Sequence, residues 1–220
     1  MKTDSTSPVP VLRKRGRPLS FDREQAIHQA MLLFWEHGYE ATSLNELTAA
    51  LNVTPSSIYT AFGDKKGLFL AAVQRYSSGP VNAESIIQGA ETAHEAACCL
   101  LQAAAIGFTG ESTPRGCLLA SSAISCSAMA QDVKDVLAGL RRSIEASLRD
   151  KIKREIKDGG LPVGTDAGTL AAHTMAVIQG MSTLARDGTS RTSLLKVVDI
   201  AMQCWPAVSK ANRAAVRATR

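Results

Sequence analysis

No stretch of the 220-residue sequence stays apolar for the roughly 20 residues that a membrane-spanning helix requires. The first 20 residues also lack the continuous apolar segment of a secretory signal peptide. These two absences predict a soluble protein that remains in the cytoplasm.

Cysteine is present, but without the spacing of a disulfide framework or a metal site. The five cysteines form an odd set, Cys98, Cys99, Cys117, Cys126 and Cys204. Such a set is typical of a cytoplasmic protein with free thiols. His94 and Cys98 lie four residues apart and would share one helix face, but two ligands do not make a metal site.

Signs of enzymatic chemistry are missing as well. The sequence has no glycine-rich phosphate loop and no nucleophile elbow, and no pair of carboxylates stands in a suggestive context. His28, His37 and His173 have no partners in sequence. We therefore expect neither an enzyme nor a bound cofactor or metal.

Strand patterns are absent after residue 80, whereas helical periods are clear, so the predicted fold class is all-α. Residues 84–108 are alanine-rich and helical with a break near Gly89, and residues 118–129 form a helix of small residues. An apolar stripe from Val133 to Ile156 predicts a long helix that Gly159 and Gly160 close. Asp166 caps a further helix, and the last one begins at Ser190 or Thr192 and runs to Trp205.

The most informative segment is Thr42 to Phe69, which predicts two short helices, a tight turn and the start of a third helix. Ser43 and Glu46 form a capping box for the first of these helices. Asn52 stands at the turn, where a left-handed backbone is needed. Thr54 and Pro55 then open the second helix. A helix-turn-helix of this kind most often grips the major groove of DNA.

The second helix, residues 55–62, divides its side chains between two environments. Ile58 and Phe62 lie four residues apart and are expected to point inward. The outer faces carry hydroxyl groups suited to phosphate oxygens and base edges. The predicted contacts from this region are Ser43, Thr54, Pro55, Ser56, Ser57, Tyr59, Thr60 and Lys65. Upstream, residues 22–37 predict a longer helix with a buried stripe that completes a three-helix core.

Residues 1–20 are poor in apolar surface and predict a flexible arm. Four cations gather within residues 13–17 of this arm, namely Arg13, Lys14, Arg15 and Arg17. Arms of this type enter an adjacent minor groove or follow phosphates, and the alternative is a solubilising tail. The net charge of +5 gathers at the chain ends, since residues 81–206 carry net −1 and residues 207–220 net +4.

Residues 21–76 resemble the DNA-binding domain of the TetR family of bacterial transcriptional regulators. The resemblance rests on LFWEHGYEATSLNELTAALNV and on TPSSIYTAFGDKKGLF with its Ile-Tyr-x-x-Phe-x-x-Lys spacing. Asn52 and Thr48 depart from the family's common glycine and alanine, which the fold tolerates. The resemblance implies four segments: a basic arm (1–20), a helix-turn-helix domain (21–76), a helical effector-binding and dimerisation domain (81–206) and a basic tail (207–220).

The resemblance further implies a homodimer through the last two helices, which reads a palindromic operator in double-stranded DNA. The alternative is that these two helices are buried wholly within one monomer. A repressor released by a small-molecule effector is the implied function. The expected pocket residues are Ala103, Ile106, Phe108, Cys117, Leu119, Ser122, Ile124, Met129 and Met175. No ligand is identified by this set.

Two alternatives remain open at this stage. Cys117 follows Pro114-Arg115-Gly116 and opens a predicted helix, so Arg115 and the helix N-terminus would lower the pKa of its thiol. The chain would then be a thiol-based redox or electrophile sensor, unless Cys117 only packs at a helix start. The other alternative is a helical small-molecule-binding protein without a role on DNA.

Overall fold

The computed structural model describes residues 21–79, 82–122, 127 and 130–206. Within these residues helices are the only regular secondary structure, which confirms the all-α prediction. The helices in chain order are α1 (Arg23–His37), α2 (Leu44–Leu51), α3 (Pro55–Phe62), α4 (Lys65–Ser77), α5 (Ala83–Gly89), α6 (Ala93–Gly107), α7 (Leu118–Ser121), α8 (Gln131–Lys157), α9 (Ala167–Arg186) and α10 (Arg191–Met202).

Local capping chemistry sets the ends of the first helices, as the sequence predicts. The Asp22 carboxylate accepts hydrogen bonds from the backbone N–H groups of Glu24 (2.9 Å) and Gln25 (3.2 Å) at the start of α1. The capping box of α2 is complete, because Ser43 N–H donates to Glu46 Oε2 (2.7 Å) and Glu46 N–H donates to Ser43 Oγ (3.1 Å). These bonds satisfy N–H groups that have no partner inside the helix.

Aromatic packing joins α1 to α4 in the core of the DNA-binding domain. Phe34 and Phe69, both fully buried, meet edge to face with 5.0 Å between ring centroids. The Tyr39 ring lies 4.9 Å from Phe69 and 6.2 Å from Phe34. Such edge-to-face pairs add stability beyond their buried area. The end of α1 is thereby fixed against α4.

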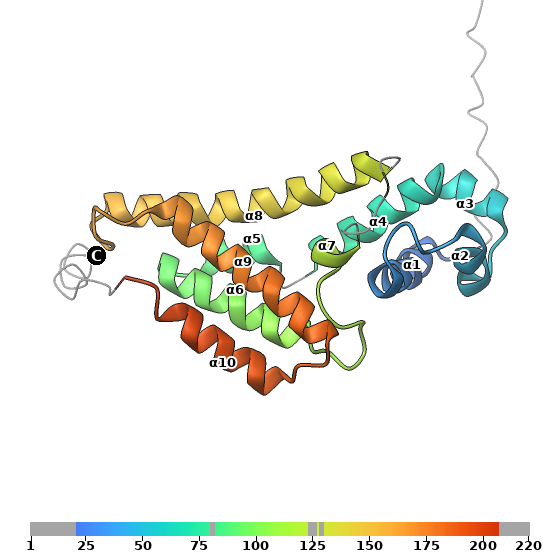
Figure 1. The fold of residues 1–220 in the computed structure, drawn as a ribbon. Helices are drawn as coiled ribbons and strands as arrows, with labels where there is room; N and C mark the ends of the chain where they lie inside the picture. Colours follow the sequence, from blue (N-terminus) through green and yellow to red (C-terminus); the bar gives the residue numbers. More distant parts are fainter. Residues whose placement is uncertain (1–20, 80–81, 123–126, 128–129, 207–220) are drawn as a thin grey trace, which may run out of the picture.

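The helical body lies on the other side of α4 and α7 (Figure 1). In this view α8 runs along one edge of the molecule, and α9, α6 and α10 lie below it. The hydrophobic core is continuous with that of the helix-turn-helix, since one cluster extends from Phe34 and Phe69 through Leu118 to Leu137. A second cluster around Ile152 and Trp205 fills the far end of the body.

Two predicted helices end earlier than expected. Of the helix predicted over 118–129, α7 ends at Ser121, where the Ser121 and Ser122 hydroxyls donate back to the carbonyls of Cys117 and Leu118, and residues 123–126, 128 and 129 lie outside the described residues. Serine bonds of this kind compete with helix continuation. The last helix ends at Met202 and not at Trp205, because Trp205 turns into the core.

Candidate DNA interface and effector cavity

The turn between α2 and α3 presents α3 on the outside of the molecule. Asn52 takes the predicted left-handed conformation with φ of 52°. Thr54 Oγ1 then accepts the Ser57 N–H (3.3 Å) and begins α3, with Pro55 at its first position. On the inner side of α3, Ile58 is fully buried, as predicted, whereas Phe62 is only half-buried. One side of α3 is thus anchored and the other is free.

The free side of α3 carries the predicted hydroxyl groups. Tyr59 is the large exposed residue of this helix, with 52% of its surface accessible. Thr54, Ser56 and Thr60 are exposed and Ser57 is half-buried. No charged residue lies within α3. This face therefore offers hydrogen bonds and an aromatic ring, while cations must come from its surroundings.

The hydroxyl groups at the start of α3 lie within hydrogen-bond distance of one another. Thr54 Oγ1 lies 2.9 Å from Ser56 Oγ and 3.0 Å from Ser57 Oγ, within hydrogen-bond distance. Thr60 Oγ1 donates to the Ser56 carbonyl at 2.8 Å. Each hydroxyl retains acceptor capacity, and those in the Thr54 cluster can rotate their donors. The set is suited to close contacts with phosphate oxygens and base edges.

Lys65, the first residue of α4, follows α3 closely in the chain but is turned toward the segment between α1 and α2. Its Nζ donates to the Glu40 carbonyl at 3.3 Å and lies 4.7 Å from the centre of the Tyr39 ring. Neighbouring Lys66 forms an ion pair with Asp132 of α8. The predicted arm residues Arg13, Lys14, Arg15 and Arg17 lie outside the described residues.

A cavity of about 390 Å³ lies between α4, α5, α6, α7, α8 and α9. This volume falls in the usual range of small-molecule sites. Its wall is mainly apolar. The lining residues are Trp35, Tyr76, Ser77, Asn82, Ala83, Glu84, Ile86, Leu100, Ala103, Ala104, Gly107, Phe108, Cys117, Leu119, Ala120, Leu140, Arg141, Ser143, Ile144, Met175, Ile178 and Gln179.

The cavity contains part of the predicted pocket set, namely Ala103, Phe108, Cys117, Leu119 and Met175. Two predicted residues lie elsewhere. Ile106 is 50% exposed, because its position on α6 faces away from the wall. Ser122 is buried against the Gly38 backbone. Ile124 and Met129 lie outside the described residues.

The sequence prediction missed the walls supplied by α4, α5 and α8, and from α9 it named only Met175, because pocket residues were sought mainly in the middle helices. Leu140, Arg141 and Ile144 come from α8, and Ile178 comes from α9. A signal for Arg141 was present. It lies four residues after Leu137 and three before Ile144, so it interrupts the apolar stripe of α8.

The alternative of a reactive thiolate at Cys117 is not supported by its surroundings. Burial raises the pKa of the Cys117 thiol and outweighs the opposite effect of Tyr76 Oη, which donates to its Sγ at 3.4 Å. Arg115 points away, since its Nε donates to the Ala185 carbonyl at 2.7 Å. The four-residue α7 adds little dipole. Cys117 is therefore a neutral thiol at the cavity wall, as its packing interpretation required.

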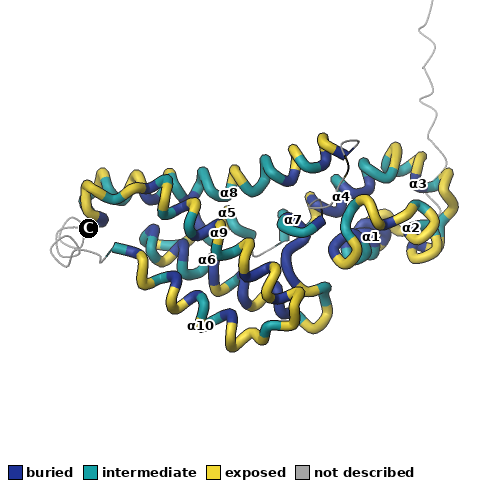
Figure 2. The backbone as a smooth tube through the Cα atoms, viewed as in Figure 1, coloured by how far each residue is buried: buried dark blue, intermediate teal, exposed yellow. Residues whose placement is uncertain are grey.

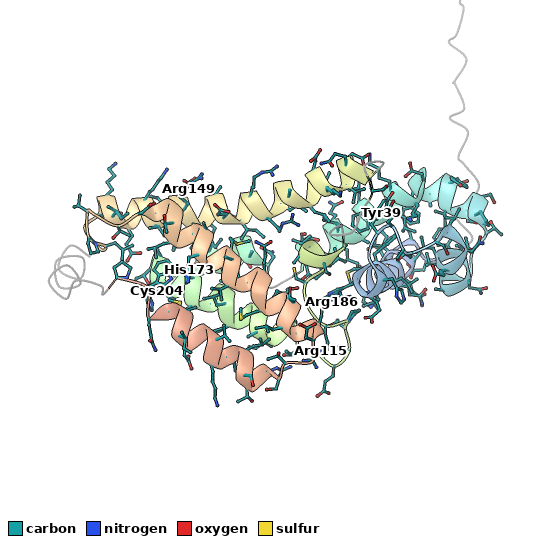
Figure 3. The ribbon with its side chains drawn as sticks, in the orientation of Figure 1. Tyr39, Arg115, Arg149, His173, Arg186 and Cys204 are labelled. Atoms are coloured by element: carbon teal, nitrogen blue, oxygen red, sulfur yellow. The ribbon has the colours of Figure 1, made fainter. Side chains whose placement is uncertain are left out.

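Short contacts join the cavity wall to the end of α1. Tyr39 N–H donates to the Ser122 carbonyl (2.8 Å) directly after α7, and Trp35 Nε1 donates to the Gly116 carbonyl (3.2 Å) directly before it. Arg186, at the end of α9, donates to the carbonyls of Trp35 (3.1 Å) and Glu36 (2.9 Å). Figure 3 shows Arg186 at this junction of body and head.

The described residues contain neither a metal-binding cluster nor a helix suited to span a membrane. His94 packs edge to face on Trp205 with 5.9 Å between ring centroids, and no group of three metal-binding side chains occurs in the described part of the chain. None of the described helices has the length and apolarity that a membrane span needs.

A helix-turn-helix whose second helix, α3, is exposed on one side, joined to a helical body, is typical of a DNA-binding regulator. The family model "Bacterial regulatory proteins, tetR family" matches residues 26–72, and "Tetracyclin repressor-like, C-terminal domain" matches residues 99–197. The HTH-type transcriptional repressor ComR of Escherichia coli is 33% identical over 212 residues, which cover 96% of this chain and 100% of ComR. The chain therefore belongs to the TetR family of bacterial transcriptional regulators.

Further relatives agree with this assignment. The HTH-type transcriptional repressor BdcR of Escherichia coli is 29% identical over 191 residues, covering 86% of this chain and 89% of BdcR. A cysteine mutant of the TetR family regulator CifR, solved with 26bp operator DNA, is 37% identical with a TM-score of 0.82. That match covers 87% of this chain and 100% of CifR. The chain is a DNA-binding transcriptional regulator and not an enzyme.

Proposed function

We propose that this regulator is a homodimeric repressor that leaves a palindromic operator when a small molecule occupies the α7 cavity. Two relatives are named repressors, and CifR is seen with operator DNA. The observation that carries the proposal is the pairing of an exposed hydroxyl-rich α3 with a cavity about 390 Å³ in volume. The proposed division of function follows the predicted domains, in which residues 21–76 bind DNA and residues 81–206 bind the effector and form the dimer.

Direct DNA contacts are proposed for the exposed side of α3 and its neighbours. Tyr59 offers a ring and a hydroxyl, and Ser56 and Thr60 are further exposed hydroxyl residues of the same helix. Because α3 has no charge of its own, the basic arm and Lys65 would supply the phosphate contacts. Affinity should consequently fall with rising salt, by an amount set by those cations.

Dimerisation is proposed through the outer faces of α9 and α10. Ala172, Ala176, Gly180 and Leu184 recur every four residues on α9 and are all exposed. A side-chain carbon added at Gly180 meets open space, so the protomer itself does not require glycine there. Ile200 on α10 is 65% exposed, and Figure 2 shows exposed positions along the outer side of this helix. Small side chains permit close helix–helix approach between two copies.

Release is proposed to pass through α7. Leu119 and Ala120 of this short helix form part of the cavity wall, while the residues at its two ends bond to Trp35 and Tyr39. A ligand that displaces α7 would therefore move the end of α1 and, with it, the orientation of α3. Such a ligand shifts the equilibrium only if it prefers the displaced state.

The test is selection of bound fragments from random DNA by the purified protein at a stated salt concentration. We expect a palindromic motif with two half-sites. Enrichment of no motif by a folded dimer would reject the repressor and favour a small-molecule-binding protein without a role on DNA.

Tyr59→Ala tests the assigned reading face. We expect specific binding to the selected operator to fall by roughly 100-fold, because a central contact of about 1–3 kcal/mol is lost from each of two half-sites. The elution volume of the dimer should not change. Fluorescence anisotropy with labelled operator measures the affinity, and Tyr59→Phe separates the hydroxyl from the ring. Unchanged affinity of the alanine variant would show that another face reads DNA.

A thiol-sensing repressor is the second candidate, because Cys117 lines the cavity. Its raised pKa argues against reaction as a thiolate. A Cys117→Ser protein that still leaves operator DNA on exposure to effector would remove this candidate, and loss of the response with intact DNA binding would favour it.

A further inference from the structure

Arg141 is a cation on the wall of an otherwise mainly apolar cavity. It lies on α8 within the apolar stripe, and the flanking residues Leu140 and Ile144 line the same cavity. Its side chain is half-buried, whereas neighbouring Arg142 is exposed and is not part of the wall. A helix with an apolar inner face gains nothing in packing from a guanidinium at this position.

The hydrogen bonds of Arg141 leave most of its donors for another partner. One Nη donates to the Leu119 carbonyl at α7. Within the described residues no carboxylate forms an ion pair with Arg141. Glu84, the acidic residue of the cavity wall, bonds instead to Gln88 (2.8 Å) and Ser147 (2.9 Å). A guanidinium carries five N–H donors in a planar fork that matches a carboxylate.

Arginine keeps its charge at all physiological pH values, so it cannot escape partial burial by losing a proton. Burial of a charge is costly unless an opposite charge or strong acceptors compensate. The cavity thus combines an apolar volume with one cationic donor that has no acidic partner. An amphipathic anion satisfies both properties at once.

We propose that the effector is a compact apolar molecule with one carboxylate or similar anionic group, which Arg141 binds. This assignment rests on the proposed function of the cavity as the effector site. The anion would compete with the Leu119 carbonyl for the same guanidinium. Occupancy would thereby loosen the bond between α8 and α7, the helix that bonds to the end of α1.

The test measures binding of three head groups on one hydrocarbon chain, octanoate, 1-octanol and octylamine, by calorimetry with the full-length protein in the absence of DNA. We expect octanoate to bind about 10-fold or more tightly than octanol, since a charge-assisted pair is stronger than a neutral hydrogen bond. Octylamine should bind most weakly. In Arg141→Gln the octanoate preference should disappear while octanol affinity stays within about threefold.

Arg142→Gln is the matched control, because it removes an arginine one position away that lies outside the wall. It should retain the full preference for octanoate. Arg141→Lys keeps the positive charge but loses the planar fork of N–H donors, and it should retain part of the preference for octanoate. This variant also tests the proposal if Arg141→Gln does not fold.

Equal affinity for octanoate and octanol, no binding of octanoate, or an unchanged preference in Arg141→Gln would each overturn the assignment. These outcomes do not depend on DNA binding. Failure of the repressor proposal would instead appear in the DNA selection, with head-group preference unaffected.

Discussion

At the residue scale, single positions fix the helix-turn-helix and its contact with the body. Asn52 is the one residue other than glycine with positive φ in the described part of the chain. Ser182 is buried, and its hydroxyl accepts the Cys117 N–H at 2.9 Å. Asn52 sets a backbone conformation and Ser182 accepts a backbone N–H, so we expect their replacement to lower the free energy of unfolding.

Asn52→Ala should lower the free energy of unfolding by about 1–2 kcal/mol, because an alanine side chain is strained in the left-handed region. Urea denaturation followed by circular dichroism measures this loss. Asn52→Gly is the control and should lose less, since glycine adopts positive φ without a steric cost. Equal losses in the two variants would show that the side-chain amide, and not backbone strain, decides stability at the turn.

Ser182→Ala should destabilise the protein by about 1–3 kcal/mol, because the buried Cys117 N–H then has no acceptor. Thermal and urea denaturation would both report the change. The adjacent Thr183 is exposed on the same helix, so Thr183→Ala should leave stability within about 0.5 kcal/mol of the original value. A Ser182→Ala protein as stable as the Thr183 variant would contradict this account.

At the scale of elements, α7 and the end of α9 determine how the body meets the head. Although α7 is only four residues long, it forms cavity wall and contacts α1 through flanking backbone groups. Arg186 adds a cation at the C-terminal carbonyls of α1, where the helix dipole is negative. These contacts hold the head in one orientation.

Arg186→Ala should increase hydrogen exchange at the end of α1 by about 10-fold, since contacts of roughly 1–2 kcal/mol are lost there. Operator affinity should fall as well, because α3 is oriented through α1. Mass spectrometry of exchanged peptides covering residues 34–42 measures the first effect.

Arg115→Ala is the matched control for Arg186, because Arg115 binds the carbonyls of Ala185 and Thr189 wholly within the body. It should destabilise the body without increasing exchange at the end of α1. Similar exchange in the two variants would mean that Arg186 has no special role in orienting the head.

At the scale of the whole molecule, two heads must be held at a fixed separation to read a palindrome. In the protomer α1–α3 lie at one end, and the outer faces of α9 and α10 remain uncovered (Figures 1 and 2). Pairing of these faces would place a head at each side of the assembly.

Ala176→Arg places a large charge in the proposed α9 interface and should produce a protein of half the dimer mass by light scattering. The affinity for the operator should also fall, by about 10-fold or more, because a monomer binds only one half-site and loses the gain from two linked heads. Val163→Arg is the control, since Val163 is 89% exposed in the segment before α9. A dimeric Ala176→Arg protein would place the interface elsewhere.

The sequence predicted those features that depend on neighbours along the chain. Ser43 with Glu46, Asn52 and Thr54 have the predicted capping and turn roles, because each bonds backbone within a few residues. The long α8 and the break after Gly89 follow from apolar period and helix-stopping residues. The predicted contacts to DNA stay predictions, since they require a partner.

Tertiary structure alone decided which side chains meet around the cavity and at the junction of head and body. Arg141 faces an apolar wall, Cys117 is buried beside Tyr76, and Arg186 reaches carbonyls about 150 residues away in sequence. Hydrogen bonds within one turn are set by local geometry, so their residues can be recognised in order. The burial of Cys117 and its pKa depend on how distant helices pack, which no local pattern encodes. The interrupted stripe of α8 marks Arg141 in the sequence, but only the packing of the helices places it on the cavity wall.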